Sequence, residues 1–388
     1  MPLKGILEEI MKTSKKITYS SILAVLVIAL LFFLDTNKSQ YGMAYTVLQK
    51  GIILAVVAVS MNLVTGFTGL FSLGQAGFMA IGAYVTAIFL IPAESIEGVY
   101  YISGVSPVIS GFKNWLESGP AWTHGFIPYL ALLMGGLVAA LFAALIGIPV
   151  LRLKSDYLAI ATLGFSEIMR ALISSPQMDK ITNGSYGLKS IKGFSSLIQT
   201  FMIAAVCITF MILLVRSTYG RAFKAIREDE IAAEAMGINL FKHKQMSFII
   251  GSFFSAVAGG MLAMFMRSID SKTFSISLTY DILLIVVIGG IGSVTGSVIS
   301  ALLVTASKEW WLRFFDAPLY IGTFKVPLFR TGFRMVVFSV ILLVVVLFYQ
   351  RGIMGRNEFS WDRLALWLKR LKRKLLRSSK EGGKKHVE

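Results

Sequence analysis

The chain has 388 residues, of which 55% are hydrophobic and 15% charged, and its formal net charge is +17. Soluble domains carry about a quarter charged residues, so this composition, with a mean hydropathy of +0.72, indicates an integral membrane protein. The single cysteine, Cys207, excludes a disulfide framework and a thiolate zinc site, and the three histidines are widely separated with no HExxH motif. A histidine-based metal or proton-relay enzyme is therefore not expected.

Apolar runs predict an all-α, polytopic helical bundle with about eight crossings. Each run approaches the roughly 20 residues that cross ~30 Å of hydrocarbon. In chain order the runs are residues 19–34, 43–63, 67–91, 126–151, 157–173, 197–215, 246–266 and 331–350. The first run follows several lysines, as in a signal peptide, but no small-residue cleavage site comes after it, so we expect an uncleaved anchor.

The segment 280–307 is longer than one crossing requires and contains Gly289, Gly290, Gly292 and Gly296 near its middle. It predicts either one long glycine-broken helix or two half-helices that form a re-entrant hairpin. Irregular backbone at membrane depth has to be buried in protein or face water, because lipid satisfies no hydrogen bonds.

The loop charges orient the chain, because Lys and Arg concentrate on the cytoplasmic side of membrane proteins. With a cytoplasmic N-terminus and a hairpin at 280–307, the cytoplasmic segments hold 24 Lys and Arg residues and the outer segments hold 11. We therefore predict a multi-pass protein of the cytoplasmic membrane with both termini cytoplasmic. Its parts are an N-terminal segment (1–18), a transmembrane domain (19–350) and a basic tail (351–388).

The basic tail also carries apolar residues at helical spacing: Trp361, Leu364, Trp367, Leu368 and Leu371. This pattern predicts a surface helix held by anionic membrane lipid. Nucleic-acid binding is the remote alternative, because any basic tail gives the same charge signal, and we do not expect it.

No catalytic constellation stands out, so we expect neither an enzyme, nor a metal site, nor a cofactor bound by this chain. No GxxxxGK[ST] motif is present, so ATP would be used by partner subunits if transport is ATP-driven. Glu167 and Arg170 lie three residues apart in one predicted span and can pair on one helix face. They are either a self-neutralised pair facing the bundle interior or groups that line a permeation path.

Five glycines cluster in and just before the third predicted span: Gly66, Gly69, Gly74, Gly77 and Gly82. They predict close helix packing in lipid or, alternatively, a helix broken near mid-membrane. Three side chains that can form hydrogen bonds lie in the same region and are our candidates for lining a translocation path: Asn62, Ser72 and Gln75.

The predicted cytoplasmic loop 216–245 contains two short helical stretches, at 222–226 and 231–236. Asp229 or Glu230 can begin the second helix, because an acid suits a helix N-terminus. Gly237 can end it, because glycine accepts positive φ. We expect a compact helical knob of mixed charge, which composition alone does not distinguish from a solvated loop.

The stretch RAFKAIREDEIAAEAMGI (221–238) closely resembles the cytoplasmic coupling loop of branched-chain amino acid ABC transporter permeases of the LivM type. Three further stretches extend the resemblance: MNLVTGFTGLFSLGQAGFMAIGA (61–83), YLAIATLGFSEIMR (157–170) and IGGIGSVTG (288–296). The chain departs from the family pattern in its long outer loop 92–125, its segment 307–330 and its extended tail.

The resemblance implies a permease subunit that pairs with a second, related permease subunit, two cytoplasmic ATPase subunits and an extracytoplasmic substrate-binding protein. It also implies that the loop seats in a groove of the ATPase and carries its motion to the membrane. The residues that would take this role are Arg227, Glu228, Asp229, Glu230, Glu234, Ala235 and Gly237.

We therefore expect the permease subunit of an ABC importer for branched-chain or other hydrophobic amino acids. A permease for urea or short amides with the same architecture is the close alternative. A stand-alone secondary transporter is the alternative from another class. The resemblance of the loop and the scarcity of acids within the predicted spans argue against it.

Overall fold

The computed structural model describes residues 18, 21–101, 104–119, 125–153, 155–316, 320–321, 324–325, 333–348, 352–355 and 358. The predicted lipid-bound helix of the tail and nearly all of the predicted N-terminal segment lie outside these residues. Among the described residues, helices account for almost every regular element, and the only strands are a short antiparallel pair, β1 (Tyr320–Ile321) and β2 (Phe324–Lys325).

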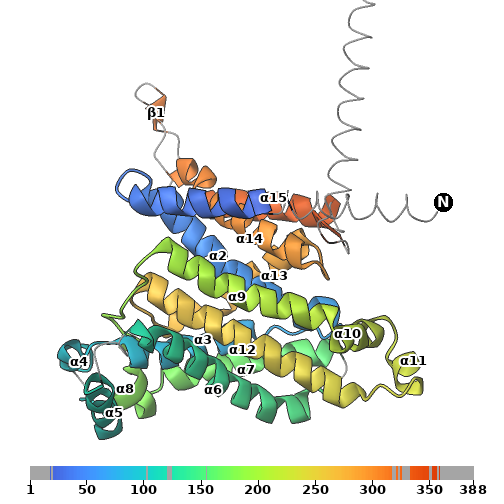
Figure 1. Ribbon diagram of the computed structural model, residues 1–388, viewed down its shortest axis with the longest axis horizontal. Helices are drawn as coiled ribbons and strands as arrows, with labels where there is room; N and C mark the ends of the chain where they lie inside the picture. The colour runs from blue at the N-terminus through green and yellow to red at the C-terminus, as the bar shows by residue number, and fades with distance from the viewer. Residues whose placement is uncertain are drawn as a thin grey trace, which may run out of the picture.

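Long helices run back and forth along one axis of the molecule (Figure 1). In chain order they are Ser21–Thr36, α2 (Gly42–Asn62), α3 (Gln75–Leu90), α6 (Ile127–Val150), α7 (Ser155–Ile173), α9 (Leu197–Arg216), α12 (Leu240–Met266), α13 (Ile276–Gly289), α14 (Val294–Glu309) and α15 (Phe333–Phe348). The shorter helices are α4 (Ala93–Val99), α5 (Pro107–Glu117), α8 (Asp179–Thr182), α10 (Thr218–Glu228) and α11 (Glu230–Ala235). Short stretches of 3-10 helix occur at Pro176–Met178, Gly184–Tyr186, Ser271–Phe274 and Trp311–Asp316.

Four of the described helices are long and apolar enough to cross a membrane: Gly42–Phe67, which is α2 with its π-helical extension, and α6, α9 and α12. The helix Tyr157–Ile173, with the bent Pro176–Thr182 after it, adds a fifth. Large apolar side chains point outward on several helices, for example Leu26 and Leu141, as is typical of a membrane-facing surface. The predicted all-α membrane bundle is confirmed, whereas the number of crossings stays a prediction.

The two ends of the bundle carry different short helices. We call the end with α10 and α11 the knob end, and the end with α4, α5 and α8 the loop end (Figure 1). At the loop end, a bridge between Leu188 and Ile269 ties two connections together. Lys113 of α5 donates hydrogen bonds to the carbonyls of Phe89 (2.7 Å) and Ile91, which anchors α5 to the last residues of α3.

The centre of the bundle is formed by α2 and α12, which are mostly buried, whereas α6 and α9 are mostly exposed on its flank. α12 packs against α3 and α6, and α2 packs against α14 and α9. The α3–α12 contact depends on glycine, because a Cβ added at Gly82 would lie 2.0 Å from the carbonyl oxygen of Ala256. Close helix packing, one of the two predictions for the glycine-rich stretch, therefore holds at this position.

The prediction of one continuous helix over 67–91 is wrong in its first part. α2 continues through a π-helical turn (Leu63–Phe67), residues 68–74 are not helical, and α3 begins only at Gln75. Gly69 has φ +81°, which glycine adopts without the steric cost of a Cβ. The broken-helix alternative therefore describes 68–74.

This non-helical segment has hydrogen-bond partners inside the bundle, as irregular backbone at membrane depth requires. Leu73 N donates to Thr162 Oγ1 (3.0 Å), and Ser166 Oγ donates to Leu73 O (3.4 Å). Both partners belong to α7, so that helix supports the start of α3.

The segment 280–307 forms two half-helices, which confirms the hairpin alternative. α13 ends at Gly289 and α14 begins at Val294, with positive φ at Gly290 and Gly292 between them. Ser300 Oγ of α14 donates to Ile285 O of α13 (2.6 Å), so the two helices run antiparallel and side by side. The hairpin tip, residues 290–293, lies at the knob end.

Candidate functional site

The knob consists of α10, α11 and the turn that follows them. α10 is longer than the sequence predicts, and α11 is close to the predicted second helix. Asp229 begins α11, because its Oδ1 accepts hydrogen bonds from Ile231 N (2.8 Å) and Ala232 N (3.0 Å). Gly237 ends α11 with φ +83°, as predicted.

The turn after α11 is closed by two backbone hydrogen bonds. Gly237 N donates to Glu234 O (2.9 Å), and Ile238 N donates to Ala233 O (3.1 Å). This pairing is the Schellman arrangement, which satisfies carbonyls at a helix C-terminus. Lys244 of α12 forms an ion pair with Glu230 (2.6 Å) and ties the knob to the next long helix. The knob is thus a defined structure and not an irregular loop.

The surface of the knob is apolar at two points and charged around them. Met236 is 83% exposed and Ile231 is 82% exposed, the largest values among the large apolar side chains that the structure describes. Glu234 and Ala235 are also exposed, whereas Ala233 is buried. Ile231 and Met236 are not among the residues predicted from the sequence. The available signal was an isolated large apolar residue at each end of a short, otherwise polar or small stretch.

Arg227 faces the bundle, unlike the rest of the predicted coupling residues. Its Nη1 donates to Gly66 O (2.7 Å), and its Nη2 pairs with Glu228 (2.6 Å). The carbonyl of Gly66 lies at the end of the α2 helix, where a cation is favourable because of the helix dipole. Arg227 therefore joins the knob to the end of α2.

Asn62 is fully buried and bonded to the hairpin tip. Its Nδ2 donates to Ser293 O (2.9 Å) and Ser297 Oγ (2.8 Å), and its Oδ1 accepts from Gly292 N (2.8 Å). The structure thus brings the predicted path residue Asn62 together with the predicted helix-break glycines Gly290 and Gly292. Gly289 and Gly296 lie behind them, where α13 and α14 touch backbone to backbone.

Gln75 and Ser72 are also buried, but they lie apart from the hairpin tip. Ser255 Oγ of α12 donates to Gln75 Oε1 and also hydrogen-bonds with Ser60 Oγ of α2 (2.7 Å), so one polar chain links α2, α3 and α12. Ser72 Oγ accepts from Gly74 N (3.4 Å). The role of Asn62, Ser72 and Gln75 in a translocation path stays a prediction.

Glu167 and Arg170 form the expected pair within α7. Arg170 Nη2 lies 2.6 Å from Glu167 Oε2, and both side chains are partly exposed. Neither side chain is a hydrogen-bond partner of Asn62 or Gln75. The pairing removes the cost of two isolated charges on a helix that crosses lipid, and lining of a path stays a prediction.

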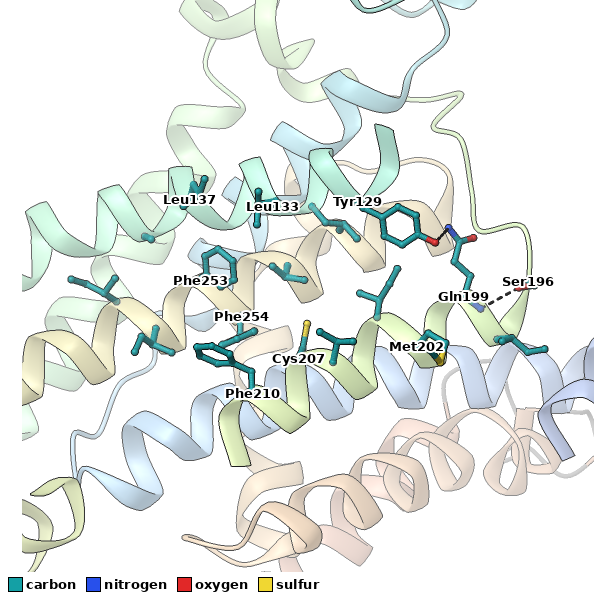
Figure 2. A pocket seen from close by; sticks show the side chains of 18 residues that line it. Tyr129, Leu133, Leu137, Ser196, Gln199, Met202, Cys207, Phe210, Phe253 and Phe254 are labelled. Atoms are coloured by element: carbon teal, nitrogen blue, oxygen red, sulfur yellow. Dashed lines mark hydrogen bonds between the residues drawn. The ribbon is translucent and has the colours of Figure 1, made fainter. Parts of the chain in front are cut away.

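A groove of about 1050 Å³ opens on the side of the bundle between α6 and α9, with α12 as its floor (Figure 2). It is lined by apolar side chains such as Leu133, Met202 and Phe253, and no charged side chain lines it. At one end Gln199 Nε2 donates to Tyr129 Oη (3.4 Å). The groove contains none of the predicted path residues. Within the described residues, no three His, Cys, Asp or Glu side chains lie together as metal ligands would.

The fold and the knob define a polytopic helical membrane protein with a structured helical projection between two of its long helices. A sequence profile of the family described as "Branched-chain amino acid transport system / permease component" matches residues 43–347. The chain belongs to this family, because the profile covers most of its length.

Curated relatives include both kinds of permease of this family. The chain is 29% identical over 322 residues (74% of this chain, 67% of the relative) to the high-affinity branched-chain amino acid transport system permease protein LivM of Salmonella typhimurium. It is 30% identical over 292 residues (66% and 61%) to LivM of Escherichia coli K12. It is 24% identical over 330 residues (79% and 93%) to the permease protein LivH of the same organism. The matches thus span about two thirds of the LivM proteins. No solved structure gives a significant match.

Proposed function

We propose that the chain is a permease subunit of an ABC importer that carries branched-chain or other hydrophobic amino acids across the cytoplasmic membrane. Its family membership and its relatives, which are named as branched-chain amino acid permeases, support this. In this proposal separate ATPase subunits use the ATP. An extracytoplasmic binding protein delivers the substrate at the loop end. The similarity to both LivM and LivH supports pairing with a second, related permease.

The exposure of Ile231 and Met236 is the main observation that supports docking of the knob on the ATPase. Both side chains lie on a short helical projection, among charged residues such as Glu228, Glu230 and Glu234. A few apolar anchors surrounded by a polar rim are typical of a protein interface. Lipid would not meet them in the proposed orientation, because the knob then lies on the cytoplasmic side. We therefore assign the two apolar side chains as anchors in the ATPase groove and Glu234 as part of the charged rim.

The test is co-purification of the proposed partner ATPases with an Ile231→Ser, Met236→Ser double variant. Truncating an interface anchor typically costs about 2 kcal/mol or more, so we expect the recovered ATPase to fall by tenfold or more. Val108→Ser is the matched control, because Val108 is 78% exposed on α5 at the opposite end of the bundle. Undiminished recovery of ATPase with the double variant would refute docking at the knob.

Uptake of radiolabelled leucine into vesicles that contain the assembled complex tests the substrate class. We expect ATP-dependent leucine uptake that isoleucine and valine compete for. Uptake of urea without uptake of leucine would refute the amino acid assignment and leave the ATPase docking intact.

A further inference from the structure

Four residues from three distant parts of the chain meet where the knob joins the bundle. We call Asn62, Gly66, Arg227 and Gly292 the junction. Arg227 contacts Gly66 O at 2.7 Å, and Gly292 N contacts Asn62 Oδ1 at 2.8 Å. A Cβ added at Gly66 would lie 1.8 Å from Asn62 Oδ1, and one added at Gly292 would lie 2.9 Å from Arg227 Nη1. The four residues therefore form one set of direct contacts.

We propose that the junction is the relay through which the knob moves the hairpin tip, with Arg227 and Asn62 as positioning residues for transport. The inference rests on the proposed function, in which bound ATPases move the knob. It goes further by naming the element that receives the motion, the α13–α14 hairpin, and the residues that pass it on.

The contacts give a continuous mechanical path from the knob to the hairpin. Arg227 lies at the last turn of α10 and holds the carbonyl of Gly66. Asn62 lies four residues before Gly66, one helical turn away, and all of its hydrogen bonds beyond its own helix go to the hairpin. A shift of α10 that pulls on Gly66 therefore also displaces the Asn62 side chain and, with it, the tip.

The tip also has a second support on its other side. Glu358, which follows α15, accepts hydrogen bonds from Val294 N (2.7 Å) and Thr295 N (3.1 Å) at the start of α14. Arg227 and Glu358 line the same crevice of about 330 Å³ beside the tip. A tip held by Asn62 and by the carboxylate of Glu358, next to open space, can move as one body when either contact changes.

The test compares Arg227→Met with Arg221→Met in the complete complex. Both substitutions remove a guanidinium from α10, but Arg221 is exposed on the surface of that helix whereas Arg227 reaches Gly66. We expect Arg227→Met to keep its ATPases bound, because Ile231 and Met236 are untouched. We expect its leucine uptake per ATP hydrolysed to fall about tenfold, the factor that loss of one hydrogen bond to a charged group carries. Arg221→Met should behave as the unmodified protein.

A second variant changes Asn62, the junction residue that contacts the hairpin, instead of Arg227. Asn62→Asp keeps the acceptor for Gly292 N but loses both donors to Ser293 and Ser297. It is far from the knob surface, so we expect bound ATPases and the same fall in uptake per ATP. Because both residues act through one relay, the Arg227→Met, Asn62→Asp double variant should take up no less leucine per ATP than the more affected of the two single variants.

Several results would overturn the inference. Uptake per ATP within twofold of the unmodified protein in Arg227→Met would exclude a relay. Release of the ATPases by Arg227→Met would make Arg227 part of the docking surface instead. If Arg227→Met does not accumulate in the membrane, Arg227→Gln decides, because its neutral side chain is two bonds shorter than arginine's. Full coupling in that variant also overturns the relay. If the Ile231, Met236 double variant retains its ATPases, the proposed docking fails independently of these results.

Discussion

Asp281 of α13 and Lys308 of α14 form an ion pair with 2.6 Å between Oδ2 and Nζ, although 27 residues separate them in the sequence. The pair joins the two open ends of the hairpin, while Gly289 and Gly296 touch near its tip. A chain that crossed the bundle once could not bring these two residues together. The pair therefore fixes the segment as a hairpin that returns to its starting end.

The first prediction concerns this ion pair. Asp281→Asn or Lys308→Met should each lower the free energy of unfolding of the detergent-purified subunit. The loss should be only roughly 1 kcal/mol, because the pair is partly exposed. Exchanging the charges, Asp281→Lys with Lys308→Asp, should restore most of the loss. It should not restore all of it, because Lys308 also lies over the Phe338 ring of α15. An exchange variant less stable than both single variants would mean that the pair does not close the hairpin.

The second prediction concerns the orientation of the bundle. In a background without Cys207, a cysteine at Ser118 should react with a membrane-impermeant maleimide added to intact cells. A cysteine at Ala235 should react only after the cells are opened. The reason is the distribution of Lys and Arg, which places the knob in the cytoplasm. Labelling of Ala235→Cys in intact cells, with protection of Ser118→Cys, would reverse the orientation.

The sequence predicted most of the architecture because the dominant signals were local. The apolar runs marked the long helices, Asp229 and Gly237 marked the two ends of α11, and the glycines at 289–296 marked the hairpin turn. Each of these signals depends on a few neighbouring residues and on one physical rule. The glycines of 66–82 left a broken helix and close helix packing as alternatives, so the limits of the non-helical stretch at 68–74 were not predicted. Its conformation depends on partners in α7, such as Thr162.

The candidate site was predicted less well, because its contacts join distant parts of the chain. Asn62 was selected for its polar side chain within an apolar run, but its partner Gly292 lies 230 residues away. Arg227 was grouped with the surface residues of the knob because it directly precedes them in sequence, whereas its side chain reaches Gly66. Glu358 was not selected at all, since nothing in its local sequence indicates a contact with α14.

The third prediction concerns the close contact between α3 and α12. Gly82→Ala would place a methyl group 2.0 Å from the carbonyl oxygen of Ala256 and force the helices apart. Overpacking of this kind costs typically about 1–3 kcal/mol, so we expect less subunit in the membrane and a lower melting temperature after extraction. Gly164→Ala on α7 is the matched control, because nothing lies within 4 Å of an added Cβ there. Equal effects of the two substitutions would show that helix propensity, and not packing, determines the result.

The fourth prediction concerns the turn that ends α11. Gly237 has φ +83° and open space around it, so a side chain there meets backbone strain but no neighbouring atom. Gly237→Val should cost about 1–3 kcal/mol in the knob. Because the knob is a local structure, we expect its strain to loosen the presentation of Met236 and reduce ATPase co-purification and substrate-stimulated ATP turnover. The rest of the subunit should still insert in the membrane.

A Gly237→Asn variant distinguishes backbone strain from the bulk of the added side chain as the cause of such a loss. Asn tolerates the left-handed conformation better than other non-glycine residues, so Gly237→Asn adds a side chain without most of the strain. We expect Gly237→Asn to retain most of the co-purified ATPase, with Gly237→Val well below it. If both variants lose the ATPase equally, the space at position 237 is part of the docking surface itself. If both retain it, α11 does not need its glycine stop to present Met236, and the knob docks through another part of its surface.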